Sequence, residues 1–310
     1  MMQLKGFSVR GFNRAKPEKG KQDLLVSIVT PSYNQGEFIE ETILSVKNQG
    51  YSNLEHIIVD GGSEDGTLEV LKKYEDTYNM RWISEEDEGH SDAVNKGFNM
   101  ARGEIIGWLN SDDVYTNTSV LRSVVKTFCQ HPDVDVVYGD ELSINEDSTI
   151  LRVQCSPRFS YHRLLQWCFL DQPAVFFRKR VTQAHHLDVR LKVAIDYEYW
   201  LRIGKEYRFF HLSKVLAADR NHAQRISEAR EDELRQVSEQ ICKQYGKKYD
   251  LFYYLTRSAD MVFSGLPRRV KGLFVLMMLR RKKDWAFPAE WDGWLASVNR
   301  QLFKVSSLRR

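Results

Sequence analysis

Four stretches of the chain each combine an apolar strand, a loop and a helix in that order. The strands are continuous apolar runs such as Leu24–Thr30, and the helices carry apolar residues three and four positions apart. Strand–helix units in series fold into a parallel sheet covered by helices, with ligands at the carboxyl ends of the strands. The sequence therefore predicts an α/β fold with a doubly wound, mainly parallel sheet. The expected strands are 24–30, 55–60, 80–83 and 104–109, and the expected helices are 37–49, 67–78, 91–101 and 118–130.

The pattern after residue 130 is less regular. It predicts a strand at 134–138, a hairpin edge at 142–153, a helix at 159–170, a strand at 174–177, a helix at 196–204, a short strand at 213–217 and long helices from 228 onward. Charge is also unevenly spread, because residues 229–310 hold 17 Lys and Arg against 9 Asp and Glu, whereas residues 1–228 hold 28 against 33. We therefore expect a flexible leader (1–23), one α/β domain (24–228) and a basic, helical C-terminal extension (229–310) that meets an anionic partner.

Composition excludes several classes of protein. A hydrophobic content of 42% and an aromatic content of 12% support a packed core rather than disorder. The four cysteines are scattered without a CxxC pair, so disulfides and structural zinc are not expected. Residues 1–22 lack the apolar segment of a signal peptide, and no apolar run reaches the roughly 18 residues of a membrane span. We expect a soluble or peripheral cytoplasmic protein without a nucleic-acid partner.

A polar motif, Asn110–Asp113, directly follows the expected strand 104–109. Paired acids at the carboxyl end of a strand are a common way for α/β proteins to hold a divalent cation against a phosphate. All four residue types also favour turns and helix caps. Taken alone, the motif favours a turn, and its neighbours in the fold must decide.

A Gly-rich loop, Asp60–Gly66, lies between the second strand and its helix. Backbone amides at such a place can face a nucleotide. The loop has neither a GxGxxG pattern nor the lysine of a P-loop, and the carboxylates of Asp60 and Asp65 suit a base or ribose better than a phosphate. A plain tight turn is the alternative interpretation.

Two further residues are candidates for chemistry. Asp196 lies at the start of an expected helix, where the helix dipole favours the ionised form that a general base needs. Simple N-capping by Asp196 is the alternative. His222 follows the short strand 213–217 and is either a metal ligand or an ordinary surface or core histidine.

Five segments together resemble one known family, the inverting family-2 glycosyltransferases with the GT-A fold. The resemblance covers roughly residues 24–228 and rests on the order and spacing of all five segments rather than on any single one. They are Val26–Asn34, Ile57–Thr67, Glu86–Gly97, Ala101–Glu104 and Asn110–Asp113.

The resemblance assigns the donor side of a sugar-nucleotide site. It implies that the loop after the first strand lines the nucleotide pocket and that Asp60 contacts the base, most often uracil. Asp113 is implied to help position the metal or the donor sugar. The complete set of donor residues implied is Pro31, Tyr33, Asn34, Asp60, Asp65, Asp92, Asn95, Asn110 and Asp113.

The resemblance also assigns the chemistry. Asp112 matches the second acid of the family's DxD element, which holds Mg²⁺ or Mn²⁺ against the diphosphate, and His222 lies where relatives offer a histidine to the metal or diphosphate. Asp196 matches the catalytic base. Asp171 and Gln172 lie in the half of the domain that handles acceptors, and a turn before a strand is their alternative role.

Two positions depart from the family pattern. The first acid of DxD is Asn110 here, whose amide can bond a ribose hydroxyl or a metal-bound water but supplies no charge. That places the charge on Asp112 and weakens the expected cation site. The catalytic acid follows Ile195 rather than the more common glutamate.

The resemblance implies an inverting, metal-assisted transferase. It would move a sugar from a nucleoside-diphosphate sugar, most often a UDP-sugar, to a hydroxyl of a glycan or lipid-linked acceptor, in envelope polysaccharide or glycan assembly. The alternative is a relative that binds sugar nucleotides or glycans without catalysis, which Asn110 alone supports. A nucleotidyltransferase is disfavoured because Pro31–Asn34 is not a Gly-rich, basic triphosphate loop.

The C-terminal extension contains an amphipathic segment. Basic clusters at 268–271 and 280–283 bracket the apolar run 273–279. Such a segment suits a helix in an anionic membrane interface, so residues 266–283 predict a peripheral location at the inner face of the membrane. A helix packed on the catalytic domain with a solvated basic face is the alternative.

Overall fold

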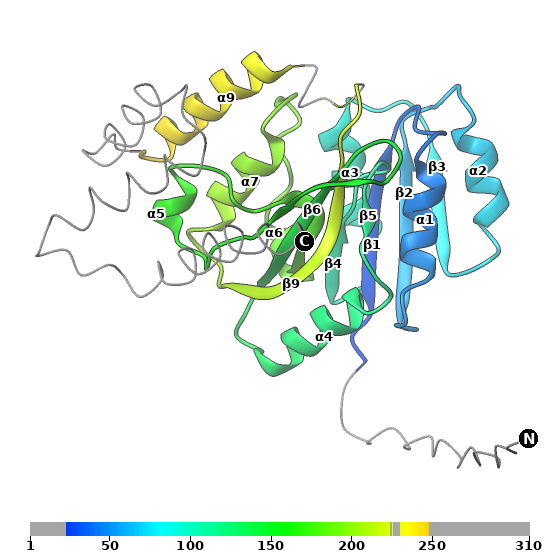
Figure 1. Cartoon of the computed structure of the whole chain (residues 1–310), viewed down its shortest axis with the longest axis horizontal. Helices are drawn as coiled ribbons and strands as arrows, with labels where there is room; N and C mark the ends of the chain where they lie inside the picture. The colour runs from blue at the N-terminus through cyan, green and yellow to red at the C-terminus, as the bar shows by residue number, and fades with distance from the viewer. Residues whose placement is uncertain (1–22, 224, 226–229, 248–310) are drawn as a thin grey trace, which may run out of the picture.

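The computed structural model describes residues 23–223, 225 and 230–247. These residues form a single sheet whose strands run in the order β3-β2-β1-β4-β8-β6-β9-β5, with β7 paired to β6 (Figure 1). The strands are β1 (Val26–Ser32), β2 (Leu54–Asp60), β3 (Met80–Ser84), β4 (Ile105–Trp108), β5 (Val114–Tyr115), β6 (Val136–Ile144), β7 (Ile150–Gln154), β8 (Val175–Arg178) and β9 (Phe209–Arg220).

Helices cover both faces of this sheet. They are α1 (Ile39–Lys47), α2 (Thr67–Tyr74), α3 (His90–Met100), α4 (Val120–Gln130), α5 (Tyr161–Leu164), the 3₁₀ turn η1 (Gln172–Ala174), α6 (Lys179–Ala184), α7 (Ile195–Ile203) and α9 (Glu231–Gln244).

The first four strand–helix units form the parallel half of the sheet, as the sequence predicts. β1 pairs in parallel with β2 and β4, and β2 pairs in parallel with β3. Alternate residues of β2 show why its apolar run is continuous: Ile58 packs with α1 and α2, whereas Ile57 packs with α3 on the other face. Because the strands are parallel, their carboxyl ends meet at one edge of the sheet.

The second half of the sheet is mixed. β8 is antiparallel to its neighbours β4 and β6, and β9 is parallel to β6. β6 and β7 form the expected hairpin, although β6 continues to Ile144. β9 is much longer than the expected strand 213–217 and carries the chain from Phe209 to Arg220. The expected doubly wound α/β fold, with a mainly parallel sheet flanked by helices, is therefore confirmed, with antiparallel pairs in its second half.

The expected helix at 159–170 is a correction. Only Tyr161–Leu164 is α-helical, and the chain then leaves the helix. The reason is tertiary: Phe169 and Leu170 are 3% and 1% exposed and enter the core, which a continued helix would not allow.

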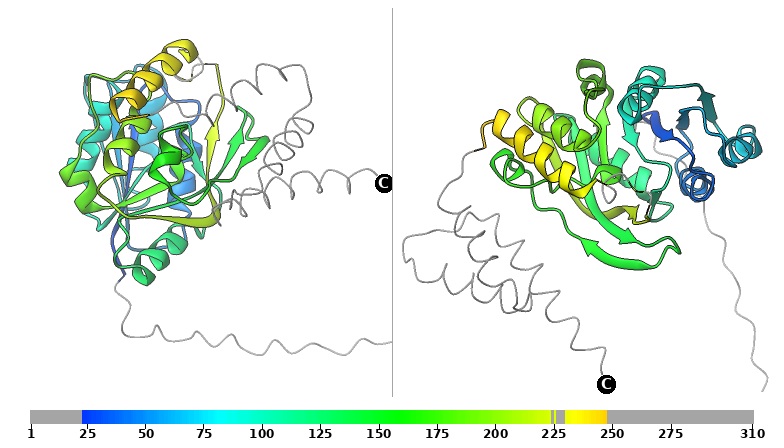
Figure 2. Two further views of the ribbon diagram at one scale, coloured as in Figure 1. Left: turned by 90° about the vertical axis from the view of Figure 1, so that its left-hand side faces the viewer. Right: turned by 90° about the horizontal axis from the view of Figure 1, so that it is seen from above.

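Aromatic packing fixes the helix that carries the expected catalytic acid. Trp200 of α7 is fully buried and stacks on Phe177 of β8, with ring centroids 5.6 Å apart. α9 lies against α7 (Figure 2), where the phenol of Tyr245 donates to Glu198 at 2.6 Å. The start of α7 is therefore held in a fixed place relative to β8 and the rest of the sheet. None of the helices in the described part of the chain has the length and apolar character needed to cross a membrane.

Candidate active site

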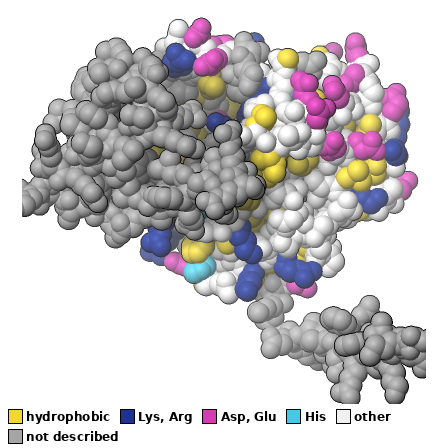
Figure 3. All heavy atoms as spheres, in the orientation of Figure 1, with side chains coloured by type: hydrophobic (Ala, Val, Ile, Leu, Met, Phe, Trp, Pro, Cys, Tyr) yellow, Lys and Arg dark blue, Asp and Glu magenta, His cyan; other side chains and the backbone are white. Residues whose placement is uncertain are grey.

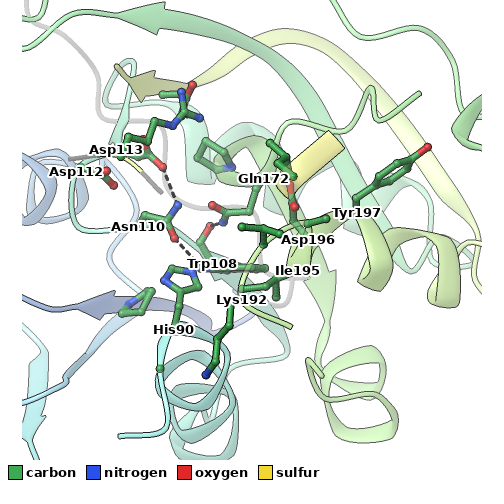
Figure 4. A pocket seen from close by; sticks show the side chains of 18 of the residues that line it. His90, Trp108, Asn110, Asp112, Asp113, Gln172, Lys192, Ile195, Asp196 and Tyr197 are labelled. Atoms are coloured by element: carbon green, nitrogen blue, oxygen red, sulfur yellow. Dashed lines mark hydrogen bonds and ion pairs between the residues drawn. The ribbon is translucent and has the colours of Figure 1, made fainter. Parts of the chain in front are cut away.

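A cleft of about 1420 Å³ lies at the carboxyl ends of the parallel strands. It runs from the loop after β1, past the turn after β4, to the start of α7 and to α9. Figure 4 shows the part between the turn after β4 and the start of α7. Acidic side chains gather over the corresponding end of the molecule, whereas Lys and Arg lie mostly at the opposite edge of the visible face (Figure 3). A ligand in the cleft would therefore contact polar residues at the carboxyl ends of the strands.

An acid of the turn after β4 pairs with a histidine that follows β9. Nε2 of His222 lies 2.9 Å from Oδ2 of Asp112, and both residues line the cleft. His222 is 5% exposed and its ring packs on Phe38, with centroids 4.8 Å apart. Residues 110 positions apart in the chain thus form one polar pair.

Asn110 makes its bonds inside the turn. Its Oδ1 accepts from the indole of Trp108 at 2.9 Å, and its Nδ2 donates to Oδ2 of Asp113 at 3.2 Å. Oδ1 of Asp113 accepts from the backbone N–H of Arg220 at 3.1 Å. Asn110 still lines the cleft, but both ends of its amide are engaged by the protein rather than directed at a ribose or a metal-bound water.

Burial raises the pKa of Asp113 well above its usual range, and the neighbouring charges of Asp112 and Asp219 raise it further. An amide donor beside this carboxyl avoids adding a third negative charge within the turn. Asn110, which departs from the family pattern, therefore limits the repulsion among the acids of this turn.

We predict that Asn110→Asp, which would restore the family's first acid, lowers the folding stability of this protein. The new carboxylate would lose the donor to Asp113 and repel it, which costs about 1–3 kcal/mol of folding free energy. The loss should be larger at pH 8 than at pH 5, because the two carboxyls can share a proton at the lower pH. Thermal unfolding at both pH values measures it, and a variant as stable as wild type at pH 8 would contradict the role of Asn110.

Arg220 holds the turn after β4 in place. Its side chain is fully buried and donates to the carbonyl oxygens of Asp112 and Glu146 at 3.0 and 2.8 Å. It also pairs with Glu41 of α1 at 2.5 Å, and its guanidinium lies over the ring of Phe38. One side chain thus ties the turn after β4 to α1 and to the β6–β7 turn.

Asp196 lines the cleft at the beginning of α7. Ala194 is the residue before the helix, with φ of 55°, and no side chain caps the helix there. Asp196 is therefore not the N-cap, which removes the alternative interpretation. Burial raises the pKa of its carboxyl, and hydrogen bonds from the backbone at Tyr197 and at Asp196 itself oppose that rise.

Pro31 and Tyr33, which the resemblance assigns to the nucleotide, line the part of the cleft next to β1, and Tyr33 is 62% exposed. Asp60 is fully buried and does not line the cleft. It accepts hydrogen bonds from the backbone N–H groups of Gly62 and Ser63 and from the hydroxyls of Ser63 and Ser84. The structure thus places Asp60 beneath the Gly-rich loop, whose shape it holds.

Asn34 and Asp65 border a smaller neighbouring hollow. Oδ1 of Asn34 accepts from the N–H of Glu64 at 3.0 Å, and Oδ2 of Asp65 accepts from the N–H of Gly36 at 2.8 Å. Although burial alone raises the pKa of Asp65, its hydrogen bonds from Thr67 and Gly36 leave it lowered. Both side chains join the loop after β1 to the loop after β2.

Asp92 and Asn95 lie on α3 away from the cleft lining. Asp92 accepts from the N–H of Glu88 at 3.2 Å and pairs with Lys96 at the same distance. The amide of Asn95 bonds both the N–H and the carbonyl of Leu187. Asp92 thus holds the loop before α3, and Asn95 joins α3 to the segment between α6 and α7.

Several residues that line the cleft were not among the site residues predicted from the sequence. His90 lies beside Trp108 with ring centroids 5.6 Å apart, and Lys192 donates to the carbonyl of Glu88 at 2.7 Å. Glu141 of β6 and Asp219 of β9 are buried acids that line the cleft next to the turn after β4. His90 lies within the segment Glu86–Gly97, and Asp219 lies three residues before His222, so the sequence pointed to both, whereas nothing local distinguishes Glu141 in its strand.

The residues present fit a cation only in part. Within the described part of the chain, no group of three or more His, Cys, Asp or Glu side chains is arranged to hold a metal ion. Asp112 and His222 nevertheless offer a carboxylate oxygen and an imidazole nitrogen side by side. Such a pair suits an ion that takes its other ligands from a diphosphate and water, as Mg²⁺ does with substrate phosphates.

Comparison with known proteins supplies the family. The family model described as Glycosyl transferase family 2 matches residues 27–182. The chondroitin synthase of Pasteurella multocida is 28% identical over 296 residues, which is 89% of this chain and 30% of that protein. This chain therefore spans less than a third of the length of that relative.

Solved structures share the fold. S. aureus TarS, in complex with UDP-GlcNAc, matches with a TM-score of 0.57 and 21% identity over 69% of this chain and 65% of that one. The mannosyltransferase PcManGT from Pyrobaculum calidifontis, in complex with GDP-Man and Mn²⁺, matches with a TM-score of 0.55 and 16% identity over 94% of this chain and 85% of that one. At these identities the likeness establishes the architecture of the chain.

Proposed function

The chain belongs to glycosyl transferase family 2, and from this premise we propose that it transfers a sugar from a nucleoside-diphosphate sugar to an acceptor hydroxyl with inversion at the anomeric carbon. One observation carries the proposal. The half-buried carboxyl of Asp196 and the Asp112–His222 pair line the same cleft, at the carboxyl ends of the strands. A base and a diphosphate-facing turn on one cleft are the two parts that a single displacement needs.

In the proposed reaction, Asp196 takes the proton of the acceptor hydroxyl as its oxygen attacks the anomeric carbon. The bond from that carbon to the diphosphate oxygen breaks, and its electron pair leaves with the nucleoside diphosphate. Because there is one displacement, no carboxylate nucleophile is required. The turn that Arg220 and Asn110 hold presents Asp112 toward the leaving diphosphate.

Asp112 and His222 would hold Mg²⁺ or Mn²⁺. When bound, such an ion would neutralise the negative charge that develops on the leaving diphosphate. PcManGT, a protein of the same fold, was solved with Mn²⁺ and a nucleotide sugar, which supports this assignment.

The donor is proposed to be a UDP-sugar. TarS, which shares the fold, was solved with UDP-GlcNAc. The exposed ring of Tyr33 on the nucleotide side of the cleft offers a surface on which a base can stack. Pro31 and the backbone of the Gly-rich loop, which Asp60 orders, would complete the base pocket.

The acceptor is proposed to be a glycan or lipid-linked sugar in polysaccharide assembly, since a relative is a chondroitin synthase. A cytoplasmic location, with contact to an anionic membrane, stays part of the proposal. The segment 266–283 on which the membrane contact rests lies outside the described residues.

A binding relative without catalysis is the alternative. That alternative rested on Asn110, and the amide of Asn110 instead bonds Trp108 and Asp113 within the turn. A missing first acid is therefore compatible with an active site in which Asp112 carries the charge.

The test is release of nucleoside diphosphate from a panel of donors with the full-length protein. UDP-glucose, UDP-galactose, UDP-GlcNAc and GDP-mannose would be assayed with and without Mn²⁺, and Asp112→Asn would serve as the inactive control. We expect release from at least one UDP-sugar that depends on Mn²⁺ and is lost in the variant. Tight UDP binding without turnover of any donor would favour the binding relative.

The pH dependence of turnover should report Asp196. Because burial raises the pKa of its carboxyl, the base becomes protonated at a higher pH than an exposed aspartate would. We expect kcat/KM to fall about tenfold per pH unit below that raised pKa. A profile that stays flat down to pH 4.5, measured where the fold is intact, would reassign the base.

A further inference from the structure

Asp171 and Gln172 are adjacent residues in the cleft. In each side chain, one polar atom makes a hydrogen bond within the protein and the other has no partner among the described residues. Nε2 of Gln172 donates to the carbonyl oxygen of Trp108 at 2.5 Å, whereas its Oε1 is buried without a hydrogen-bond partner among the described residues. Oδ1 of Asp171 accepts from the side-chain amide of Gln154, whereas its Oδ2 is likewise buried without a partner among them. Both residues line the cleft.

The orientation of Gln172 is decided by its neighbour. The carbonyl of Trp108 can only accept, so the nitrogen of the amide must face it and the oxygen must face away. The residue is 8% exposed, so this oxygen is not turned toward bulk water. Buried acceptors in native proteins are almost always satisfied, which indicates that a ligand supplies the missing donors.

The position of the two oxygens identifies the part of the ligand. Gln172 lies between the turn of Asn110 and the start of α7 with Asp196 (Figure 4). Trp108 bonds both Asn110 and Gln172, which ties the latter to the turn proposed to face the diphosphate. In the proposed reaction, the transferred sugar must lie between the diphosphate and the base.

The acids around these two oxygens restrict the charge that the sugar can carry. This side of the cleft, called the acidic wall below, is lined by three acids, Glu141, Asp171 and Asp219. Arg225 is already paired with Asp219 at 2.6 Å. Burial raises the pKa of Glu141 to about 11 and that of Asp171 to about 7, and the charges of neighbouring acids such as Asp219 add to both rises, so this side of the cleft disfavours added negative charge. Arg152 on β7 also lies near enough for its charge to lower the pKa of Asp171. A further carboxylate in this place would meet repulsion.

We propose that Gln172 and Asp171 form a subsite that accepts hydrogen bonds from the hydroxyls of the transferred sugar, and that this sugar is an uncharged hexose rather than a uronic acid. The inference rests on the proposed function and moves these residues from the acceptor to the transferred sugar. Two fixed acceptors beside an acidic wall select a ligand rich in donors and free of negative charge.

The test compares donors and two variants of the full-length protein. Asp171→Asn keeps the shape and the bond from Gln154 but places a donor where Oδ2 stands, and Gln172→Met removes the free oxygen. We expect kcat/KM for the best neutral UDP-hexose to fall about tenfold or more in each variant, with the Kd for UDP unchanged. UDP-glucuronic acid should be turned over at least about a hundredfold less efficiently than that hexose by wild type. Asp188→Asn is the matched control, because Asp188 is a partly buried carboxyl that pairs with the exposed Arg190 and does not line the cleft.

Deoxy forms of the best donor give the sharper readout. Wild type should discriminate against the analogue that lacks the recognised hydroxyl, and Asp171→Asn should lose that discrimination. A raised KM for the acceptor with unchanged donor kinetics would return the residues to the acceptor, and UDP-glucuronic acid as the best donor would overturn the neutral sugar.

Failure of the proposed function has a different signature. If wild type turns over no donor, calorimetry with UDP and UDP-glucose still decides the subsite. Tighter binding of the UDP-hexose in wild type, lost in both variants, supports the subsite. Equal binding of the two ligands to wild type overturns it.

Discussion

Asp196→Asn should reduce sugar transfer by about a thousandfold, the scale of a lost general base, while UDP binds as tightly as to wild type. An amide has the size of the carboxyl but cannot take the proton of the acceptor hydroxyl. Asp196 lies at the α7 end of the cleft, opposite the turn assigned to the diphosphate, so donor affinity should be unaffected. Initial rates of UDP release with acceptor present, and calorimetry with UDP, measure the two quantities.

The same variant should fold at least as stably as wild type at pH 8. The pKa of Asp196 is raised in the folded protein, so the folded state binds its proton more tightly than the unfolded state does. The cost of the ionised carboxylate is absent below the unfolded pKa of about 3.9 and is fully present above the folded pKa. Asparagine removes that cost at pH 8.

Asp133→Asn is the matched control for this variant. Asp133 is exposed before the start of β6 and pairs with Arg208, so the same chemical change there should leave turnover intact. Loss of UDP binding in Asp196→Asn with an unchanged melting temperature would reassign Asp196 to the donor site.

Arg220→Met should destabilise the fold by about 3 kcal/mol or more, the scale of removing one partner from a buried charged network. Methionine fills much of the same volume but donates no hydrogen bond. The carbonyl oxygens of Asp112 and Glu146 would lose their donor, and Glu41 would lose its cation. Urea unfolding measures the change, and activity should fall with it because the turn of Asp112 loses its support.

Two substitutions separate the contributions of Arg220. Arg220→Lys retains the charge but not the planar set of donors, so it should be intermediate in stability. Arg208→Met removes an exposed arginine that pairs with Asp133 and should leave the melting temperature unchanged. If Arg220→Met were as stable as Arg208→Met, the buried guanidinium would not hold the turn.

Local sequence patterns predicted the parallel half of the fold well. The strands β1, β2 and β4 contain apolar runs that are buried on both faces, so their residues alone distinguish them from helices. The helix expected at 159–170 was wrong because burial of Phe169 and Leu170 overrides helical spacing. The length of β9 was also missed, since its first half is only partly buried and lacks a clear pattern.

The candidate site divides in the same way. The polar motif after β4, the acid that begins α7 and the histidine after β9 could all be found in the sequence, because each lies at an end of an expected element. Whether a polar side chain faces the ligand or the protein could not, since that depends on partners far away in the chain. Asp60, Asp92 and Asn95 bond neighbouring loops, whereas Gln172 and Asp171 keep one free oxygen each.

The sequence by itself determined the family, the order of the strand–helix units and the acids at their ends, because these follow from local periodicity and from motifs of adjacent residues. Only the tertiary structure decided what Asn110 does, why Arg220 is needed and which wall is acidic. These properties arise where β4, β6, β9 and α7 meet, and there the hydrogen-bond partners and the burial of each group are set by residues up to 179 positions apart, as in the pair of Arg220 with Glu41.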